Sequence, residues 1–359
     1  MARALALAER GLFTTTPNPR VGCVIAANGV VVGEGWHERA GSPHAEVNAL
    51  ADVAAHGRSA RGATMYVTLE PCNHTGRTPP CVDAVIESGV TRVVVAVADP
   101  NPTAGRGVQR LRAAGIAVDM GLCADDAREQ NIGFFSRMTR GRPWVRMKAA
   151  TSVDGRTALA SGESKWITGE AARADGHRWR ARACAMLTGV GTVHQDDPQL
   201  TVRAIPTSRQ PRRIVIDRHA ETPASARVLL GGDVLIVTAS AKRNPAWPAN
   251  VEHLALPDAN GRVDLPALMR KLGEMEVNEL HVEAGGKLNG ALLAAGLVDE
   301  LLLYVAPCII GDPARALAEF PSPLAQLSDR IALSLRDITR LDDDLRIVAR
   351  VVPRMTAPE

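Results

Sequence analysis

The sequence predicts an α/β protein built from two domains. At 359 residues the chain exceeds the length that one hydrophobic core usually organises. Short apolar runs alternate with segments of helical periodicity, and strands outnumber helices, which is typical of the α/β class. Gly141-Arg142-Pro143 interrupts this alternation. We therefore expect one domain over residues 1–141 and a second over residues 142–359.

Local signals define the elements of the first domain. The amphipathic run over 1–10 predicts a helix ended by Gly11 rather than a signal peptide, because Glu9 and Arg10 interrupt its apolar residues. Asn28-Gly29 between two apolar runs predicts a hairpin. The later elements are a helix from residue 44, a strand over 64–69, a helix over 80–88, a strand over 92–98, a helix over 108–114, a strand over 116–120 and one helix over 125–139.

The second domain starts a new alternation at Trp144. The predicted strands cover 144–150, 184–188, 212–217, 233–238, 279–283 and 299–306, and the predicted helices cover 169–182, 264–273 and 286–296. A terminal hairpin is expected over 332–339 and 345–352, around the three aspartates at 342–344.

Composition excludes several classes of function. Of the residues, 46% are apolar and 23% charged, and the formal net charge is +3, which argues against a dedicated nucleic-acid surface. No run approaches the about 20 apolar residues of a membrane span. The six cysteines form no dense framework, which favours a reducing compartment, so we expect a cytoplasmic protein.

The strongest motif is His44-Ala45-Glu46, followed by Pro71-Cys72 and then Cys81. A single His or Cys is more often a core or surface residue, but one His, two Cys and a Glu two residues after the His are typical of a zinc deaminase. Three protein ligands leave a fourth metal position for water, and the Glu moves protons. The eight residues between the two cysteines depart from the usual Pro-Cys-x-x-Cys.

A second chemistry is indicated in the second domain. Gly189-Val190-Gly191 fails to complete Gly-x-Gly-x-x-Gly. However, this segment follows a predicted strand, and residues 281–290 run from a predicted strand into a glycine-rich helix start. Both places suit a phosphate. Each alone is more often a tight turn, but together they favour a nucleotide-type cofactor. Lys148 lies in a run that otherwise reads as buried strand, whereas Asp196-Asp197-Pro198 by itself reads as a solvated turn.

Further motifs carry a resemblance that covers nearly the whole chain. They lie at residues 16–22, 44–46, 70–81, 152–155, 161–168, 189–193, 196–203 and 282–286. With them the chain resembles the bifunctional riboflavin-biosynthesis deaminase/reductases. The resemblance implies an N-terminal cytidine-deaminase-like α/β/α domain and a C-terminal dihydrofolate-reductase-like α/β domain. The first would deaminate a phosphorylated diaminopyrimidinone with one Zn²⁺, and the second would reduce its ribosyl group to ribityl with NADPH.

The resemblance also implies roles for residues of the deaminase domain. His44, Cys72 and Cys81 would bind zinc, and Glu46 would be the proton shuttle. Asn18 would hold the pyrimidine. His74 and Arg77 would contact the ribose phosphate, where relatives often carry Lys in place of Arg77, a tolerable change for a phosphate contact.

In the reductase domain, Lys148 would lie at the reacting centre. The implied cofactor positions are Ala150, Trp166, Thr192, Asp196, Gly285, Gly286, Lys287, Leu288, Asn289, Gly290 and Ala291. The implied substrate positions are Ser164, Arg180, Leu200, Arg203 and Glu283. The expected partner is this small phosphorylated substrate, with neither nucleic acid nor membrane, and a homo-oligomer is expected.

Two other functions compete with this one. A single-activity nucleobase or tRNA deaminase with a non-catalytic second domain would not need Lys148, Asp196, Arg203 and Glu283 in register with the reductase pattern. A structural zinc module that binds nucleic acid would need a fourth protein ligand, for which His74 is the nearby candidate. With two Tyr and four Phe in the chain, stacking platforms for bases are scarce.

Overall fold

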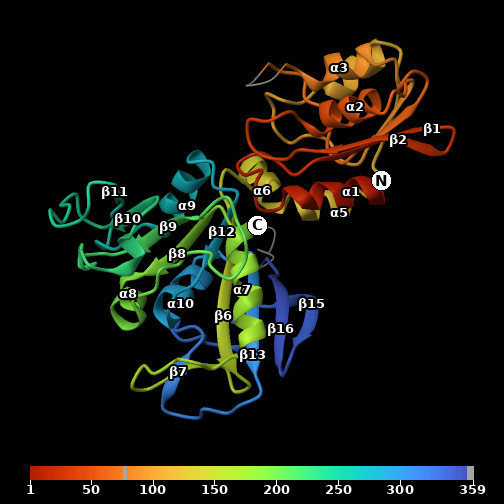
Figure 1. Ribbon diagram of the computed structural model, residues 1–359. Coiled ribbons are helices and arrows are strands. Elements are labelled where there is room, and N and C mark those ends of the chain that lie inside the picture. The colour runs from red at the N-terminus through yellow and green to blue at the C-terminus, as the bar shows by residue number, and fades with distance from the viewer. Residues whose placement is uncertain (76–78, 354–359) are drawn as a thin grey trace. The chain divides into compact units, whose positions relative to one another are not determined.

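The computed structural model describes residues 1–75 and 79–353. The chain divides into two compact units, Met1–Gly141 and Arg142–Glu359 (Figure 1). Among the described residues, no helix is both long enough and apolar enough to cross a membrane. The mixed α/β class predicted from the sequence is confirmed in both units.

The first unit is built on a five-stranded sheet of order β2-β1-β3-β4-β5. Its strands are β1 Gly22–Ala27, β2 Val30–Trp36, β3 Thr64–Val67, β4 Arg92–Val95 and β5 Ala117–Met120. The first two form the predicted antiparallel hairpin, whose turn residues Asn28 and Gly29 have φ of 50° and 78°. Strands β3, β4 and β5 run parallel, as their connecting helices require.

The helices of this unit are α1 Ala2–Ala8, α2 Ala45–Ala55, α3 Cys81–Glu87, α4 Gly107–Ala113, α5 Ala124–Gln130 and α6 Ile132–Arg140. The prediction of one helix over 125–139 is wrong, because the helix is interrupted at Asn131, which lies between α5 and α6. The Asn131 side chain accepts the Arg20 N–H at 2.7 Å and donates to the Arg20 carbonyl at 2.8 Å. A contact with a distant segment therefore overrides the local helical pattern.

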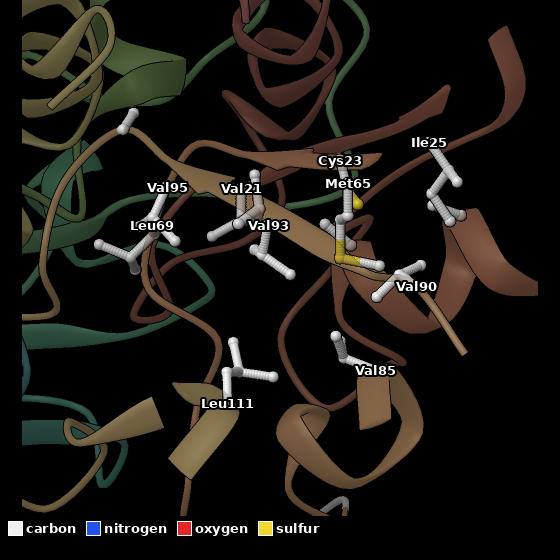
Figure 2. Close-up of a cluster of buried hydrophobic side chains, with 14 of the residues drawn as sticks. Val21, Cys23, Ile25, Met65, Leu69, Val85, Val90, Val93, Val95 and Leu111 are labelled. Atoms are coloured by element: carbon white, nitrogen blue, oxygen red, sulfur yellow. The ribbon is translucent and has the colours of Figure 1, made fainter. Parts of the chain in front are cut away.

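Alternate residues of β1, β3 and β4 fill the core of this unit. Figure 2 shows Cys23 and Ile25 of β1 beside Met65 of β3 and Val93 of β4, all with no exposed surface. On the neighbouring strand β2, Gly35 allows helix α2 to approach closely. A Cβ at Gly35 would stand 2.3 Å from the Ala49 nitrogen. This close packing sets the position of the first turn of α2.

The second unit contains a nine-stranded sheet of order β11-β10-β9-β8-β12-β6-β13-β16-β15. Its strands are β6 Trp144–Ser152, β8 Ala185–Gly189, β9 Arg212–Ile216, β10 Val234–Thr238, β11 Val251–Ala255, β12 Glu279–Val282, β13 Glu300–Ala306, β15 Leu333–Leu341 and β16 Asp344–Val351. Pairing is parallel from β11 to β13, and β13, β16 and β15 pair antiparallel, which includes the predicted terminal hairpin.

The helices in the described part of this unit are α7 Glu170–Arg182, α8 Val190–Asp196, α9 Leu265–Glu274 and α10 Gly286–Ala294. The chain also forms single turns of 3₁₀ helix at Glu9–Gly11, Arg227–Leu229 and Leu327–Asp329. The sequence analysis did not anticipate α8, β11 or the two-stranded sheet of β7 Arg156–Leu159 with β14 Ala314–Ala316. The last of these is short and pairs segments that lie far apart in the chain.

The parallel strands β8, β12 and β6 are neighbours, so their carboxyl ends lie along one edge of the sheet. Chain segments that leave such an edge usually form the binding sites of α/β proteins. Here they carry Gly189 at the end of β8 and Glu283 immediately after β12. The second chemistry indicated by the sequence is therefore expected at this edge of the sheet.

Candidate active sites

In the first unit, three side chains converge as metal ligands would. One nitrogen of His44 and the sulfurs of Cys72 and Cys81 all lie within 4.8 Å of one another. The His44 Nδ1 is 3.1 Å from the Cys81 Sγ and 3.5 Å from the Cys72 Sγ. One imidazole and two thiols are a donor set that suits Zn²⁺, and no fourth protein ligand joins them among the residues described. The site therefore fits a catalytic rather than a closed structural zinc.

Local structure explains how these donors meet. His44 is the N-cap of α2 and Cys81 is the first residue of α3, while Cys72 lies in the segment after β3. The Cys81 N–H donates to the Cys72 sulfur at 3.4 Å, and the Val82 N–H donates to the Cys72 carbonyl at 3.3 Å. Hydrogen bonding from the Cys81 thiol lowers the pKa of Cys72 to about 4 and in turn raises the pKa of Cys81.

Glu46 lies in the first turn of α2 with 3% of its surface exposed. Burial raises the pKa of Glu46 to about 7, against the opposing charge of His44. Its carboxyl also hydrogen-bonds to the Cys81 thiol. A carboxyl with a pKa near neutrality is suited both to take and to give a proton.

Asn18 is held by a residue that the sequence analysis did not single out. The His37 Nδ1 lies 3.1 Å from the Pro43 carbonyl, which can only accept, so this nitrogen carries the proton. The His37 Nε2 is therefore an acceptor for the Asn18 amide nitrogen at 3.1 Å. This assignment directs the Asn18 Oδ1 away from His37. His37 lies directly after β2. Its ring packs edge-to-face against the ring of His44, with 5.2 Å between the ring centroids.

The remaining predicted deaminase residues are only partly placed. His74 is partly buried, and its Nδ1 has no hydrogen-bond partner among the described residues. Arg77 lies outside the described residues. Asp99 was missed by the sequence analysis. Burial raises the pKa of Asp99 to about 6, and its charge is felt by His44 and Cys72, which places a second carboxyl near the metal ligands.

In the second unit, Glu283 and Arg180 form a bidentate ion pair. The Arg180 Nε and Nη2 donate to the two carboxylate oxygens at 2.6 and 2.8 Å, and the Nη1 donates to the Thr201 carbonyl at 3.3 Å. Burial opposes ionisation of Glu283, but Arg180 and Lys148 outweigh it and hold the pKa of Glu283 well below its ordinary value. Three predicted site residues from β6, α7 and the end of β12 thus lie together.

Of the two cations beside Glu283, Arg180 and Lys148, the second has unused hydrogen-bonding capacity. Its ammonium lies 5.6 Å above the Tyr304 ring and makes no hydrogen bond or ion pair that the described residues supply. Burial lowers the pKa of Lys148, and Glu283 offsets part of that effect. A lysine in this state is suited to polarise a substrate oxygen or to donate a proton to it.

Two strand-to-helix turns meet beside this group. Helix α8 begins after Gly189 and α10 begins after Gly285, and neither has a side-chain cap on its first N–H groups. A Cβ at Gly285 would lie 3.9 Å from the Thr192 Oγ1, and one at Gly189 would lie 3.3 Å from the Leu288 side chain. Uncapped N–H groups on two adjacent glycine turns fit the phosphates of a nucleotide cofactor.

The structure distinguishes among the other predicted cofactor positions. The Asn289 amide donates to the carbonyls of Ala284 and Leu317, so this buried side chain holds the fold. A Cβ at Gly290 would lie 1.9 Å from the Glu319 carbonyl oxygen, so Gly290 permits close packing. Gly286 also faces residues 316–319, Lys287 is exposed and Ala291 is partly buried.

The other predicted positions lie on β6, on α8 and in the segment before α7. Trp166 is 72% exposed, with the Arg173 guanidinium stacked 4.6 Å from its ring centre. Ala150 faces Tyr304 across the β6–β13 pairing. Asp196 is the last residue of α8, and Ser164 lies partly buried in the segment before α7.

Leu200 and Arg203 follow α8. Leu200 is 2% exposed and packs in the core, with φ of 53°. Arg203 is exposed, and its guanidinium donates to the side chains of Gln199 and Thr201 at 3.0 and 2.9 Å.

Two family models match the sequence. One is described as the RibD C-terminal domain and matches residues 143–347, and the other is the cytidine and deoxycytidylate deaminase zinc-binding region and matches residues 1–97. Riboflavin biosynthesis protein RibD of Escherichia coli strain K12 is 48% identical over 96% of this chain and 96% of its own. The protein of the same name from Aquifex aeolicus is 42% identical over 97% of this chain and 96% of its own.

Solved structures agree with these matches. Acinetobacter baumannii RibD, form 1, has a TM-score of 0.90 at 42% identity and covers 98% of both chains. A Thermotoga maritima diaminohydroxyphosphoribosylaminopyrimidine deaminase/5-amino-6-(5-phosphoribosylamino)uracil reductase has a TM-score of 0.90 at 34% identity, covering 98% of this chain and 97% of its own. The similarity therefore extends over both units.

Proposed function

The chain belongs to the RibD family of riboflavin-biosynthesis proteins, and from this premise we propose which unit and which residues perform each of its two reactions. Residues 1–141 deaminate a diaminopyrimidinone that carries a ribosylamino 5′-phosphate, and residues 142–359 then reduce its ribosyl group. This substrate is the one in the name of the Thermotoga maritima deaminase/reductase. The resemblance stated from the sequence motifs is confirmed at the level of the family.

The deaminase proposal rests on the convergence of His44, Cys72 and Cys81 beside the buried Glu46. These three side chains would hold Zn²⁺, which would supply an activated water because the metal lowers the pKa of water toward neutrality. Glu46 would accept a proton from water and deliver one to the leaving amine. Asn18, oriented by His37, presents its Oδ1 to the pyrimidine.

The reductase proposal rests on Lys148 beside the Arg180–Glu283 pair. NADPH supplies the hydride when bound at the glycine turns around Thr192 and Gly285. Lys148 polarises the sugar oxygen and supports its protonation, and Asp196 is a weaker candidate for an acid/base partner. Arg203 and the Arg180–Glu283 pair hold the phosphorylated sugar.

One pair of measurements tests the proposal on the purified chain. Metal analysis should find one zinc per chain. A spectrophotometric assay should show NADPH oxidation when the deaminated intermediate is supplied. A chain that contains zinc and deaminates, but never oxidises NADPH on this intermediate, would instead be a single-activity deaminase.

Two further expectations complete the proposal. A cytoplasmic location is supported by the six cysteines, none of which forms a disulfide bond. A homo-oligomer is expected from the family resemblance alone, and sedimentation of the purified chain would establish its state.

A further inference from the structure

His177 lies beside the reductase residues, although neither the sequence motifs nor the mechanism above uses it. It stands on α7, one helical turn before Arg180, and is partly buried. Its Nδ1 accepts the backbone N–H of Arg203 at 3.3 Å. Because residues three apart share one helix face, His177 and Arg180 contact the same following segment.

That segment, residues 199–203, is held to α7 by two hydrogen bonds. Arg180 donates to the Thr201 carbonyl at 3.3 Å, and His177 accepts from Arg203. The intervening Val202 is tied instead to the Gln210 side chain, at 2.7 and 3.0 Å. The bond to His177 is thus the direct link between α7 and the backbone of Arg203, a predicted substrate ligand.

Burial, together with the charges around His177, keeps its ring neutral. Burial lowers the pKa of His177 to about 4, and Arg180 on its own helix, Arg203 on the loop and Lys148 on β6 act in the same direction, against Glu283 after β12. A neutral imidazole that accepts at Nδ1 carries its proton on Nε2. Nδ1 is therefore available as an acceptor near neutral pH.

We propose that His177 is a positioning residue of the reductase site, which holds Arg203 in place to bind the anionic, phosphorylated sugar of the substrate. The inference rests on the proposed reduction. His177 acts through Arg203 and not on the reacting atoms. Its loss should weaken substrate binding much more than it slows hydride transfer.

Two substitutions separate the nitrogens of the ring. In His177→Asn the amide oxygen can stand where Nδ1 stands and keep the bond to Arg203. In His177→Gln the longer amide reaches the place of Nε2 and loses that bond. We expect His177→Asn to keep the KM for the deaminated intermediate within about twofold of wild type. We expect His177→Gln to raise it roughly three- to tenfold, the size of one hydrogen bond.

The KM for NADPH and the kcat of reduction should change less than about twofold in both variants. Exposed His194 on α8 provides the matched control: His194→Asn and His194→Gln should leave every constant at its wild-type value. Unchanged NADPH binding and thermal unfolding would show that the second unit is folded in each variant.

A double-mutant cycle tests whether His177 acts through Arg203. Added to Arg203→Ala, His177→Gln should produce no further rise in the KM. Full additivity, equal KM values for the Asn and Gln variants, or impairment of the Asn variant alone would overturn the inference. If the wild-type chain itself failed to oxidise NADPH on the intermediate, the proposed function would fail instead, so the two failures are distinguishable.

Discussion

Arg180 and Glu283 form a bidentate ion pair, with N–O distances of 2.6 and 2.8 Å, that joins helix α7 to the chain segment after β12. The two residues are 103 positions apart in sequence. Lys148 adds a second positive charge beside the same carboxylate. The pair is therefore both part of the proposed substrate site and a link between α7 and the sheet.

Removing one partner of this pair should destabilise the second unit. In Arg180→Ala the Glu283 carboxylate keeps its burial but loses its bidentate donor. We expect a loss of roughly 2–4 kcal/mol in the free energy of unfolding, below that of a fully buried pair because the side chains are 17% and 16% exposed. Urea unfolding would measure it. Lys271→Ala, in an exposed pair on α9, is the control and should cost less than about 1 kcal/mol.

The double variant Arg180→Ala/Glu283→Ala should recover part of the stability lost in Arg180→Ala, because it removes the buried carboxylate that the single variant leaves without its bidentate donor. A double variant less stable than either single one would contradict this account of the pair.

Cys72→Ser should remove both zinc and deamination. Serine offers no thiolate, and the remaining His44 and Cys81 are too few to hold the metal. Atomic absorption and a deaminase assay on the same preparation would measure both losses. The exposed Cys308→Ser is the matched control and should keep full zinc content. Wild-type zinc in Cys72→Ser would remove this residue from the ligand set.

Glu46→Gln should retain zinc but lose deamination by about 10²–10⁴-fold, or more, because one carboxyl serves two proton transfers. The amide is nearly isosteric with the buried carboxyl and cannot carry the proton. Reduction of supplied deaminated intermediate should continue at the wild-type rate, since the second unit is unaltered. Near-normal deamination with bound zinc would contradict the role of Glu46.

Lys148→Ala should abolish reduction of the deaminated intermediate while deamination by the same preparation persists. The variant loses the cation beside Glu283 that makes no hydrogen bond or ion pair with the described residues. In the wild-type protein, burial lowers the pKa of Lys148 below its ordinary 10.5. Because the protonated form is the active one, the reduction rate should fall as the pH rises, with a midpoint below 10.5. Unchanged reduction in Lys148→Ala would remove it from the mechanism.

Gly35→Ala should weaken the zinc site from a distance. Its Cβ would meet the Ala49 nitrogen at 2.3 Å, so α2 must shift away from β2 and carry His44 and Glu46 with it. Such overpacking costs about 1–3 kcal/mol. A chelator competition would measure the lower zinc affinity. Gly57→Ala is a control with open space at its Cβ, although its φ of 64° adds local strain. Wild-type zinc affinity in Gly35→Ala would contradict this prediction.

Many features of this protein can be predicted from local sequence patterns, without knowledge of tertiary contacts. The hairpin turn at Asn28-Gly29, the buried parallel strands and the His44, Cys72 and Cys81 motif could all be read from the sequence, because turn chemistry, apolar periodicity and metal preference depend on residue type and spacing. The motifs of residues 152–155 and 196–203 likewise indicate the family from residue type and spacing alone.

Other features depend on residues that meet only after folding. The helical pattern over 125–139 gave no sign of the break at Asn131, because the two bonds to Arg20 that compensate for it span 111 positions. His37 orients Asn18, and His177 holds Arg203, each through a single hydrogen bond. Such bonds produce no periodic pattern in the amino-acid sequence. The sequence by itself determined which chemical groups this protein has. The tertiary structure decided which of them touch, because contact between distant segments depends on how whole elements pack.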